Sequence, residues 1–370
     1  MVQLGHTVIQ ILLLMTASRQ RMRGKANSMK KKNIHIVTAI LIITILAYFG
    51  PFTAQATQKT IELRVISGHA ETHVAQVALK EWIKRIENRS GRRIQMQVFW
   101  GTFGKVTDFY DMVKNGVVDI AEMGTGWSGG RMPICEIVDL PFESPDMETT
   151  GTILHTLLSR GLLKELDPFK VMEIHSQITG NLFLTNRKVV TLEQLAGMKI
   201  RPIPGVTTQL VESWGGVPVA VRTPDLYMAL QKGQIDGFLT SPDNAVGMKL
   251  YEVCRYQVRI PTFNGVFVTI MNKNSWNRLP PDLQNVIEEV NEEMIDFRLS
   301  FYRSLSEESQ KKLDERIESY RLSIEEEARW KRASEGITET WINKMEAKGL
   351  PGRSAVTIMR SLVALESSSK

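Results

Sequence analysis

Strand-like and helix-like segments alternate along most of this chain, and this alternation restricts the fold more than any other feature of the sequence. Residues 61–68 form a β-branched run, residues 74–90 carry apolar side chains at helical spacing, and residues 93–100 alternate like a strand. The same rhythm recurs from residue 171 to residue 271. Strands that alternate with helices predict an α/β fold with largely parallel strands.

Two segments of the chain, residues 112–124 and 229–241, have the same sequence pattern. Each ends a predicted helix, turns at Gly116 or Gly233, and enters a short apolar strand. Glycine suits the left-handed position at the end of a helix. In open α/β sheets, ligands bind beyond the carboxyl ends of the strands. We therefore expect the loops after both strands to lie at a cleft between two domains, for which 370 residues suffice.

The C-terminal part of the chain has a different composition. From residue 282 to about residue 348 it is rich in Glu, Lys, Arg, Leu and Ile, and Pro280 and Pro281 stand just before this run. Proline fits the first turn of a helix but not its interior. This pattern predicts one or more long helices.

The segment from Met29 to Ala56 has the order of a secretory signal peptide. Three lysines precede an apolar stretch, and small residues follow it. We expect cleavage after Ala56 and a periplasmic mature chain. An uncleaved membrane anchor is the alternative, although the apolar stretch is short for a span. We interpret residues 1–28 as a mis-annotated or unstructured leader.

The net positive charge of the chain comes from residues 1–56. Seven of the 46 Lys and Arg residues lie within residues 1–56, which hold no Asp or Glu, so residues 57–370 carry 39 basic against 40 acidic residues. A nearly neutral body argues against nucleic acid as a partner. Cys135 and Cys254 would lie in an oxidising compartment, where both a disulfide and two buried thiols remain open interpretations.

Several motifs in sequence order resemble the solute receptors of tripartite ATP-independent periplasmic (TRAP) transporters, the family that includes binders of four-carbon dicarboxylates and sialic acid. The resemblance covers roughly residues 60–345. Its most specific parts are LEQLAGMKIRPIP (192–204), GGVPVAVRTPDLYMALQKGQIDG (215–237), KLYEVCRY (249–256) and MNKNSWNRLPPDLQNVIEE (271–289).

The resemblance implies a two-domain periplasmic solute-binding protein, type II-like, with a ligand cleft between its domains. The first domain would span residues 57–180, with returning segments from the C-terminal region, and the second residues 181–270. Residues 271–370 would form long helices that pack across both. The implied ligand is a small organic acid, the implied partners are the membrane subunits of a TRAP transporter, and neither a cofactor nor catalysis is implied.

Arg201 is the first candidate for a ligand contact. It ends a strand-like run and is followed by Pro202 and Pro204, which would stiffen the next turn. In the family that the chain resembles, the arginine at this position binds the ligand carboxylate. A guanidinium offers a planar fork of donors that matches a carboxylate and stays charged. The structural alternative is an arginine that is satisfied by an acidic neighbour or that caps the C-terminus of a helix.

Further candidates come from the same resemblance. The family usually has another basic or polar group within residues 177–189, where Asn181, Thr185 and Asn186 are available. Arg187 stands at the end of this strand, where it could contact the ligand or be solvated. Thr240 stands where many members have asparagine, with Asn244 further on. This departure from the pattern leaves the second polar contact of the ligand open. Phe263 and Asn264 lie near the expected hinge, where either residue could contact the ligand.

The glycine-rich segment 124–133 and an earlier strand end supply aromatic and basic candidates. Trp127 could stack on a ligand, and Arg131 could provide a second positive charge. Trp100 ends a strand on the side of the expected cleft. For each of these residues, a core or surface position is the alternative.

The HAETH segment, with His69, Glu71 and His73, permits a different interpretation. Clusters of His and Glu can bind a metal ion, so a secreted metal-dependent enzyme is an alternative function. The spacing differs from the HExxH arrangement of hydrolases. In the family that the chain resembles, a histidine near His73 helps to form the cleft. A third function is a receptor that serves a sensor or a different transporter.

Overall fold

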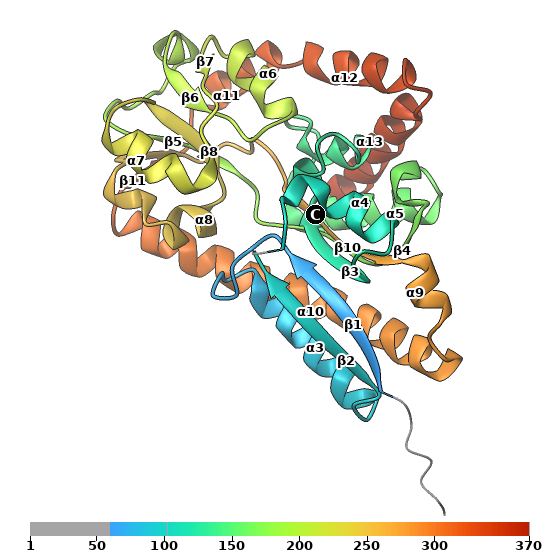
Figure 1. Cartoon of the computed structure of the whole chain (residues 1–370). Coiled ribbons are helices and arrows are strands. Elements are labelled where there is room, and N and C mark those ends of the chain that lie inside the picture. Colours follow the sequence, from blue (N-terminus) through green and yellow to red (C-terminus); the bar gives the residue numbers. More distant parts are fainter. Residues whose placement is uncertain (1–59, 102, 370) are drawn as a thin grey trace, which may run out of the picture. The chain divides into compact units, whose positions relative to one another are not determined.

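The computed structural model describes residues 60–101 and 103–369 of the chain. The expectations for residues 1–28, for the signal peptide 29–56 and for cleavage after Ala56 therefore lie outside the described residues. Two β-sheets form the framework of the described part, and helices cover both of them (Figure 1). The predicted α/β class is confirmed.

The first sheet has five strands in the order β2-β1-β3-β10-β4. β1 runs parallel to β2 and β3, whereas β10 runs antiparallel to β3 and β4. The strands are β1 (Ile61–Ser67), β2 (Ile94–Trp100), β3 (Ile120–Gly124), β4 (Phe169–Ser176) and β10 (Val266–Asn272).

The second sheet has six strands in the order β11-β9-β5-β8-β6-β7. β5 is antiparallel to its neighbours β8 and β9, and the other pairs are parallel. The strands are β5 (Asn181–Leu184), β6 (Lys199–Arg201), β7 (Val217–Pro218), β8 (Gly237–Thr240), β9 (Tyr256–Val258) and β11 (Glu318–Tyr320).

The prediction of largely parallel strands is wrong, because both sheets are mixed. In each sheet the antiparallel strand is the one that the chain enters directly from the other sheet, β5 after β4 and β10 after β9. A parallel neighbour in the same sheet needs a long crossover, usually through a helix. A strand that arrives from another sheet is free of this requirement.

Two short segments that connect the sheets, residues 177–180 and 259–265, lie side by side. The amide of Gly180 donates to the carbonyl of Phe263 at 2.9 Å, and the amide of Thr262 donates to the carbonyl of Gly180 at 3.1 Å. A Cβ on Gly180 would lie only 2.0 Å from the ring of Phe263. The close approach of this ring explains a glycine at position 180.

The helices surround these sheets, and α10 is the longest described helix, with 34 residues. Pro280 and Pro281 stand at its start, no glycine or further proline interrupts it, and it contacts α3 and β4 as well as α8 and β11. The helices are α3 (Gln76–Arg89), α4 (Phe109–Lys114), α5 (Met147–Ser159), α6 (Val206–Ser213), α7 (Leu226–Gln231), α8 (Pro242–Gly247), α9 (Lys273–Asn277), α10 (Pro281–Asp314), α11 (Ile324–Ala333), α12 (Gly336–Glu346) and α13 (Gly352–Ser369). Short 3-10 turns are Val106–Asp108, Thr125–Trp127, Cys135–Asp139, Lys164–Leu166, Leu192–Leu195, Thr223–Asp225 and Leu250–Glu252.

The predicted likeness of the segments at Gly116 and Gly233 extends to their side chains. Both glycines have positive φ, 71° and 66°. Asp119 then accepts a hydrogen bond from the amide of Arg64 at 2.8 Å, and Asp236 accepts one from the amide of Lys199 at 2.7 Å. In both sheets, an aspartate in the turn thus accepts from an amide of the neighbouring strand, in the middle of β1 for Asp119 and at the start of β6 for Asp236.

The core contains the large apolar side chains of both sheets and of the C-terminal helices. Trp214 is buried beside Trp330, with ring centroids 4.6 Å apart, and its Nε1 donates to the carbonyl of Trp330 at 3.2 Å. Cys135 and Cys254 are buried free thiols. In the described part of the chain, no helix is long and apolar enough to cross a membrane.

Candidate functional site

Arg201 ends β6, and its side chain is almost completely buried, with 5% exposed. Its guanidinium donates to the carbonyl of Val221 at 3.2 Å, to Oγ1 of Thr223 at 3.0 Å and to the carbonyl of Leu239 at 3.5 Å. Burial lowers the pKa of this guanidinium, because it removes the charge from water. All three acceptors are neutral, so no carboxylate of the described residues compensates the charge.

Asn181 and Thr240 lie opposite each other where β5 begins and β8 ends. Thr240 is buried, while Asn181 is half-buried. The amide of Asn181 accepts from Nε2 of Gln257 at 3.0 Å and donates to the carbonyl of Thr179 at 3.3 Å. These two predicted residues are therefore neighbours, and they belong to the same sheet as Arg201.

Four rings meet beyond the carboxyl ends of β1 and β3, and we call them the aromatic cluster: His69, His73, Trp127 and Phe267. His69 stacks on His73 with ring centroids 4.1 Å apart and on Phe267 at 5.5 Å. Trp127 meets both His69 and Phe267 edge-on at 5.0 Å. Trp127 and the two histidines remain partly exposed, so the cluster presents aromatic surface to solvent or to a ligand.

Two glycines make room for Trp127. A Cβ on Gly68 would lie 2.5 Å from this ring, and a Cβ on Gly124 would lie 3.1 Å from it. Glycine at both positions therefore lets the indole lie against the backbone at the ends of β1 and β3.

A buried polar network of Ser67, Gln76 and Glu122 contacts the ring of His69 through Gln76. Nε2 of Gln76 lies 3.2 Å from Nδ1 of His69 and donates to Glu122 at 3.2 Å. Oγ of Ser67 contacts both Gln76 and Glu122. Burial and, to a smaller extent, the neighbouring His73 together lower the pKa of His69 to about 3. His69 is therefore neutral near pH 7.

His73 connects the cluster to the second sheet. Its Nδ1 accepts from the amide of Ala75 at 3.2 Å. Burial lowers the pKa of His73, whereas the charge of Asp243 and a hydrogen bond with the side chain of Asn244 raise it. Asp243 and Asn244 belong to α8, directly after β8. The structure thus brings together the predicted residues His73 and Asn244 from opposite sides of the expected cleft.

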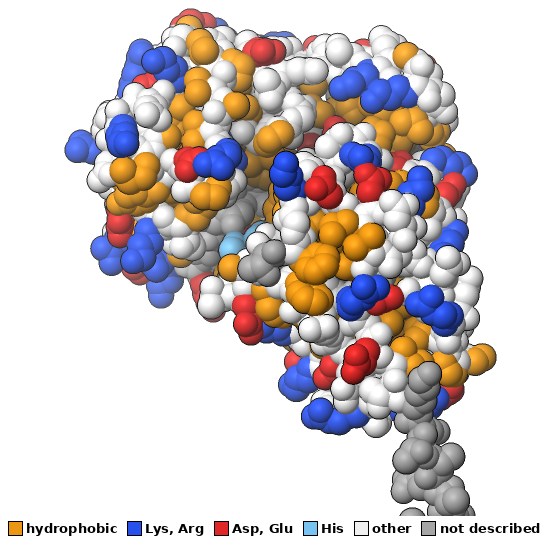
Figure 2. All heavy atoms as spheres, viewed as in Figure 1, with side chains coloured by type: hydrophobic (Ala, Val, Ile, Leu, Met, Phe, Trp, Pro, Cys, Tyr) orange, Lys and Arg blue, Asp and Glu red, His pale blue; other side chains and the backbone are white. Residues whose placement is uncertain are grey.

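The space-filling view shows a hollow at this place (Figure 2). Histidine atoms, in pale blue, lie at its base, between the part of the molecule that contains α8 and the part that contains the tip of β1 in the same view of Figure 1. Residues that follow β1, β3 and β8 contact one another here, since His69 contacts Trp127 and His73 lies near Asp243 and Asn244.

Arg131, Arg187 and Trp100 lie outside this group. Nη2 of Arg131 forms an ion pair with Asp111 at 2.5 Å on the surface. Arg187 is exposed after β5. Trp100 packs against the core between the first sheet, α3 and α10, with Nζ of Lys80 5.4 Å from its ring. None of these three has a described contact with the aromatic cluster or with Arg201.

Phe263 and Asn264 hold the connecting segments together. The amide group of Asn264 donates to the carbonyls of Val138 and Ser144 and accepts from Oγ1 of Thr179 at 2.6 Å. With Phe263 lying on Gly180, both residues have structural contacts where we predicted the hinge.

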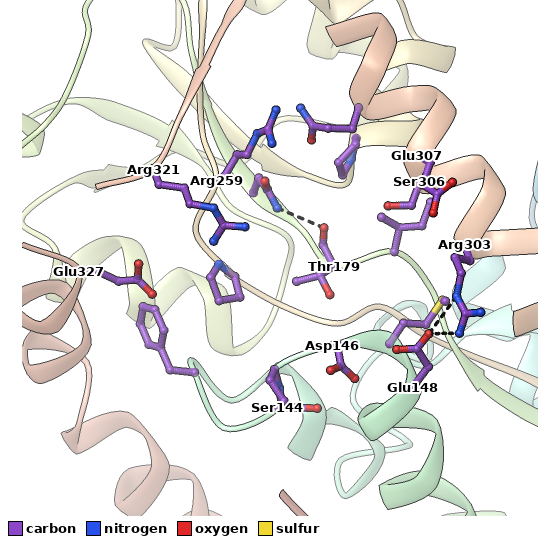
Figure 3. Close-up of a pocket in the computed structure, with 18 of the residues that line it drawn as sticks. Ser144, Asp146, Glu148, Thr179, Arg259, Arg303, Ser306, Glu307, Arg321 and Glu327 are labelled. Carbon is purple, nitrogen blue, oxygen red and sulfur yellow. Dashed lines mark hydrogen bonds and ion pairs between the residues drawn. The ribbon is translucent and has the colours of Figure 1, made fainter. Parts of the chain in front are cut away.

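A cavity of about 640 Å³ lies beside the connecting segments (Figure 3). Asn181 is among its lining residues, whereas Arg201 and the aromatic cluster are not. Its walls carry both signs of charge, with Arg259, Arg303 and Arg321 near Glu307 and Glu327. This mixture does not select an acidic ligand.

The three residues of the HAETH segment do not form a common site. Whereas His69 and His73 stack, Glu71 is exposed and forms an ion pair with Lys80 at 3.1 Å. Within the described ranges, no group of three or more His, Cys, Asp or Glu side chains is placed to hold a metal ion.

Sequence reasoning missed Phe267, Thr223 and Asp243. Phe267 lies in a strand whose seven residues are all buried, so the sequence gives no sign that one ring reaches a cleft. Thr223 lies inside the motif 215–237 and Asp243 follows Thr240, and neither residue carries a pattern of its own. Thr223 is identified as a site residue only by its contact with Arg201, and Asp243 only by its proximity to His73.

Comparisons with known proteins agree on one family. The model of the bacterial extracellular solute-binding proteins, family 7, matches residues 67–345. The protein named "Outer membrane transporter protein TsaT", from Comamonas testosteroni, is 23% identical over 337 residues, which cover 89% of this chain and 97% of that protein.

Two solved structures have closely similar folds. The first is a TRAP solute binding protein from Rhodoferax ferrireducens T118 in complex with copurified benzoate; it is 25% identical with a TM-score of 0.75, and the match covers 84% of this chain and 99% of that one. The second is a marine metagenome TRAP solute binding protein specific for aromatic acid ligands, in complex with 3-hydroxybenzoate. It is 23% identical with a TM-score of 0.76, over 83% of this chain and 98% of that one.

Proposed function

The chain belongs to the bacterial extracellular solute-binding proteins of family 7, and from this premise we propose that it is a periplasmic receptor for a small organic acid with an aromatic ring. The observation that carries the proposal is the buried guanidinium of Arg201 without a carboxylate partner among the described residues. A buried charge is costly unless it is paired, and the carboxylate of a ligand would pair it.

A comparison of the two buried arginines supports this assignment. Arg298, with 2% of its surface exposed, forms an ion pair with Glu173, whereas Arg201 has only neutral acceptors. The three neutral acceptors orient the guanidinium and leave its charge uncompensated. In a closed cleft, a hydrogen bond to a charged group contributes about 1.5–3 kcal/mol.

The aromatic cluster supports a ring-bearing acid. Trp127 and His69 present partly exposed ring surface at the hollow, and offset or edge-on ring pairs contribute about 0.5–1.5 kcal/mol each. The structural relative from Rhodoferax ferrireducens contains copurified benzoate, which has the same combination of a ring and one carboxylate.

Closure of the two sheets around the ligand would be the working motion. The connecting segments 177–180 and 259–265 are short, as is typical of a hinge, and they are hydrogen-bonded to each other. Ligand contacts from both sides would favour the closed state, because a ligand shifts a population only by its different affinity for the two states. The closed receptor would then deliver the acid to TRAP membrane subunits.

Thermal unfolding of the purified protein tests the proposal. The panel contains benzoate, 3-hydroxybenzoate, succinate and glucuronate, and Arg201→Met is compared with the exposed control Arg187→Met. A ligand at about 100 times its Kd adds about 2.7 kcal/mol to the stability of the protein. We expect benzoate or 3-hydroxybenzoate to raise the Tm of the parent and the control by several degrees and to leave Arg201→Met unchanged. Equal stabilisation of Arg201→Met would refute the role of this arginine.

Delivery to a TRAP transporter has its own test. We expect the purified receptor to restore uptake of the identified acid into proteoliposomes that contain the two membrane subunits of a TRAP transporter. Uptake at the same rate without the receptor would contradict this part of the proposal.

A further inference from the structure

A second cavity, of about 650 Å³, lies at the edge of the first sheet, beside β4 and between α5 and α10. It is lined by residues of these three elements and contains neither Arg201 nor a member of the aromatic cluster. Because β4 is the last strand of its sheet, the cavity lies at the opposite edge from β2.

A row of polar side chains leads across the sheet to this cavity. The register of the strands places Ser67, Glu122, Thr269 and Glu173 side by side on β1, β3, β10 and β4. All four are buried, and the row ends at Glu173 in the wall of the cavity. Oγ of Ser67 donates to Glu122 at 3.0 Å, so the first two members are hydrogen-bonded.

Arg298 of α10 lies over this row. It is 2% exposed and forms an ion pair with Glu173. Its terminal nitrogens Nη1 and Nη2 have no hydrogen-bond partner among the described residues, although both are buried. Buried donors are normally satisfied, so we expect Nη1 and Nη2 of Arg298 to have a hydrogen-bond acceptor in the cavity.

His175 adds a second unsatisfied group in the same wall. It is 9% exposed, and neither Nδ1 nor Nε2 has a hydrogen-bond partner in the described part of the chain. Its ring stacks on Tyr302 with centroids 5.7 Å apart. Burial and the positive charge of Arg298 lower the pKa of His175, so the ring is neutral and offers one donor and one acceptor.

The remaining walls fix the chemical class of the ligand. Ile174, Ile295 and Leu299 line the cavity together with the ring of Tyr302, whereas α5 adds polar side chains, among them Glu148, Thr152 and Thr156. A guanidinium beside an apolar wall matches a carboxylate that carries an apolar body. The nitrogens of Arg298 and His175 would bind the carboxylate group.

The charge around Arg298 must be balanced when an anion enters. Glu173 lies near Arg298 of α10, Glu122 of β3 and His175 of its own strand. Tyr302 of α10 and Glu148 of α5 line the same cavity, and His155 of α5 lies near His175. Burial raises the pKa of Glu122, and it raises the pKa of Glu173 to about 7. A proton on Glu173 would free the charge of Arg298 for a ligand.

We propose that this cavity is a second binding site, which takes up a small apolar carboxylate on Arg298 and His175 together with one proton from solvent on Glu173. The site is distinct from the cleft at Arg201 and does not depend on the function proposed for that cleft.

Gly151 of α5 provides a variant that fills the cavity. It lines the cavity, its φ is ordinary, and a Cβ built on it meets no atom within 4 Å. Gly151→Phe would therefore occupy the cavity without backbone strain. Gly336→Phe is the matched control, because this glycine is also helical, also has open space around its Cβ, and does not line the cavity.

The experiment counts radiolabelled benzoate bound per chain by equilibrium dialysis of the full-length protein at pH 6 and pH 8. We expect Gly151→Phe to bind one benzoate fewer than the wild type and Gly336→Phe to bind the same number. In the wild type, benzoate should bind to the site that Gly151→Phe lacks about tenfold more weakly at pH 8 than at pH 6, since the fraction of protonated Glu173 falls tenfold. Glu173→Gln should keep this site and abolish its pH dependence.

Two results would overturn the proposal. The first is an equal benzoate count for both phenylalanine variants, including a count of zero, and the second is equal affinity at pH 6 and pH 8. Arg201→Met separates the two sites. If the function proposed for the cleft fails, Arg201→Met binds as much benzoate as the wild type, and the difference between the two phenylalanine variants is unaffected.

Discussion

The guanidinium of Arg201 donates from Nη2 to Oγ1 of Thr223 over 3.0 Å, and this hydroxyl is its one side-chain acceptor among the described residues. Backbone carbonyls of Val221 and Leu239 accept the other bonds. Neutral groups on three sides therefore hold the fork in one orientation. A fork that is already oriented loses less conformational entropy when a carboxylate binds.

Thr223→Val tests this orientation. The substitution keeps the shape of the side chain and removes the hydroxyl acceptor. Since a hydrogen bond contributes about 0.5–1.5 kcal/mol net, we expect carboxylate affinity, measured by calorimetry, to fall about three- to tenfold. Thr223→Ser keeps the hydroxyl and should bind nearly as well as the wild type. Equal loss in both variants would show that the threonine methyl group, and not the hydroxyl, matters.

Gly68→Ala tests the position of Trp127. The added methyl group would lie 2.5 Å from the indole ring, so the ring must move. Overpacking of this kind costs about 1–3 kcal/mol, and we expect the free energy of unfolding in urea to fall by this amount. The control is Gly126→Ala, where a Cβ meets no atom within 4 Å. Similar stability of the two variants would contradict the tight packing of Trp127.

His69 makes stability depend on pH. Its pKa is about 3 in the folded protein and near 6.5 in the unfolded chain, so between these values the unfolded chain binds the additional proton. Stability from this group is present above about pH 6.5 and is lost as the pH falls towards 3. Because Glu173 contributes with the opposite sign, the test compares the wild type with His69→Gln. We expect the stability of His69→Gln to fall less between pH 7 and pH 5, by on the order of 1 kcal/mol.

Asp236→Ala tests the similar turns of the two sheets. The carboxylate accepts from the amide of Lys199 at 2.7 Å, and its removal leaves the start of β6 without this bond. We expect a loss of about 1 kcal/mol in stability and faster hydrogen exchange at the amide of Lys199. Asp236→Asn retains an acceptor oxygen and should exchange at nearly the wild-type rate. Unchanged exchange in Asp236→Ala would remove the role of this aspartate in fixing the strand.

Features that depend on near neighbours in the chain could be read from the sequence. The left-handed turns at Gly116 and Gly233 and the proline start of α10 are local, because they follow from the conformational limits of single residues. The motifs around Arg201 indicated the family through their order along the chain, and the family model confirms it. Strand direction depends on segments that are distant in the chain. The prediction of largely parallel sheets was therefore wrong where strands arrive from the other sheet.

The tertiary structure alone decided which side chains meet. Ser67, Glu122, Thr269 and Glu173 come from four strands spread over some 200 residues, and only the register of the sheet aligns them under Arg298. The absence of a carboxylate near Arg201, in the part of the chain that the structure describes, likewise follows from packing. The sequence determined the types of residue and their local turns; burial and distance arise when remote segments pack, and these set the charge balance of each site.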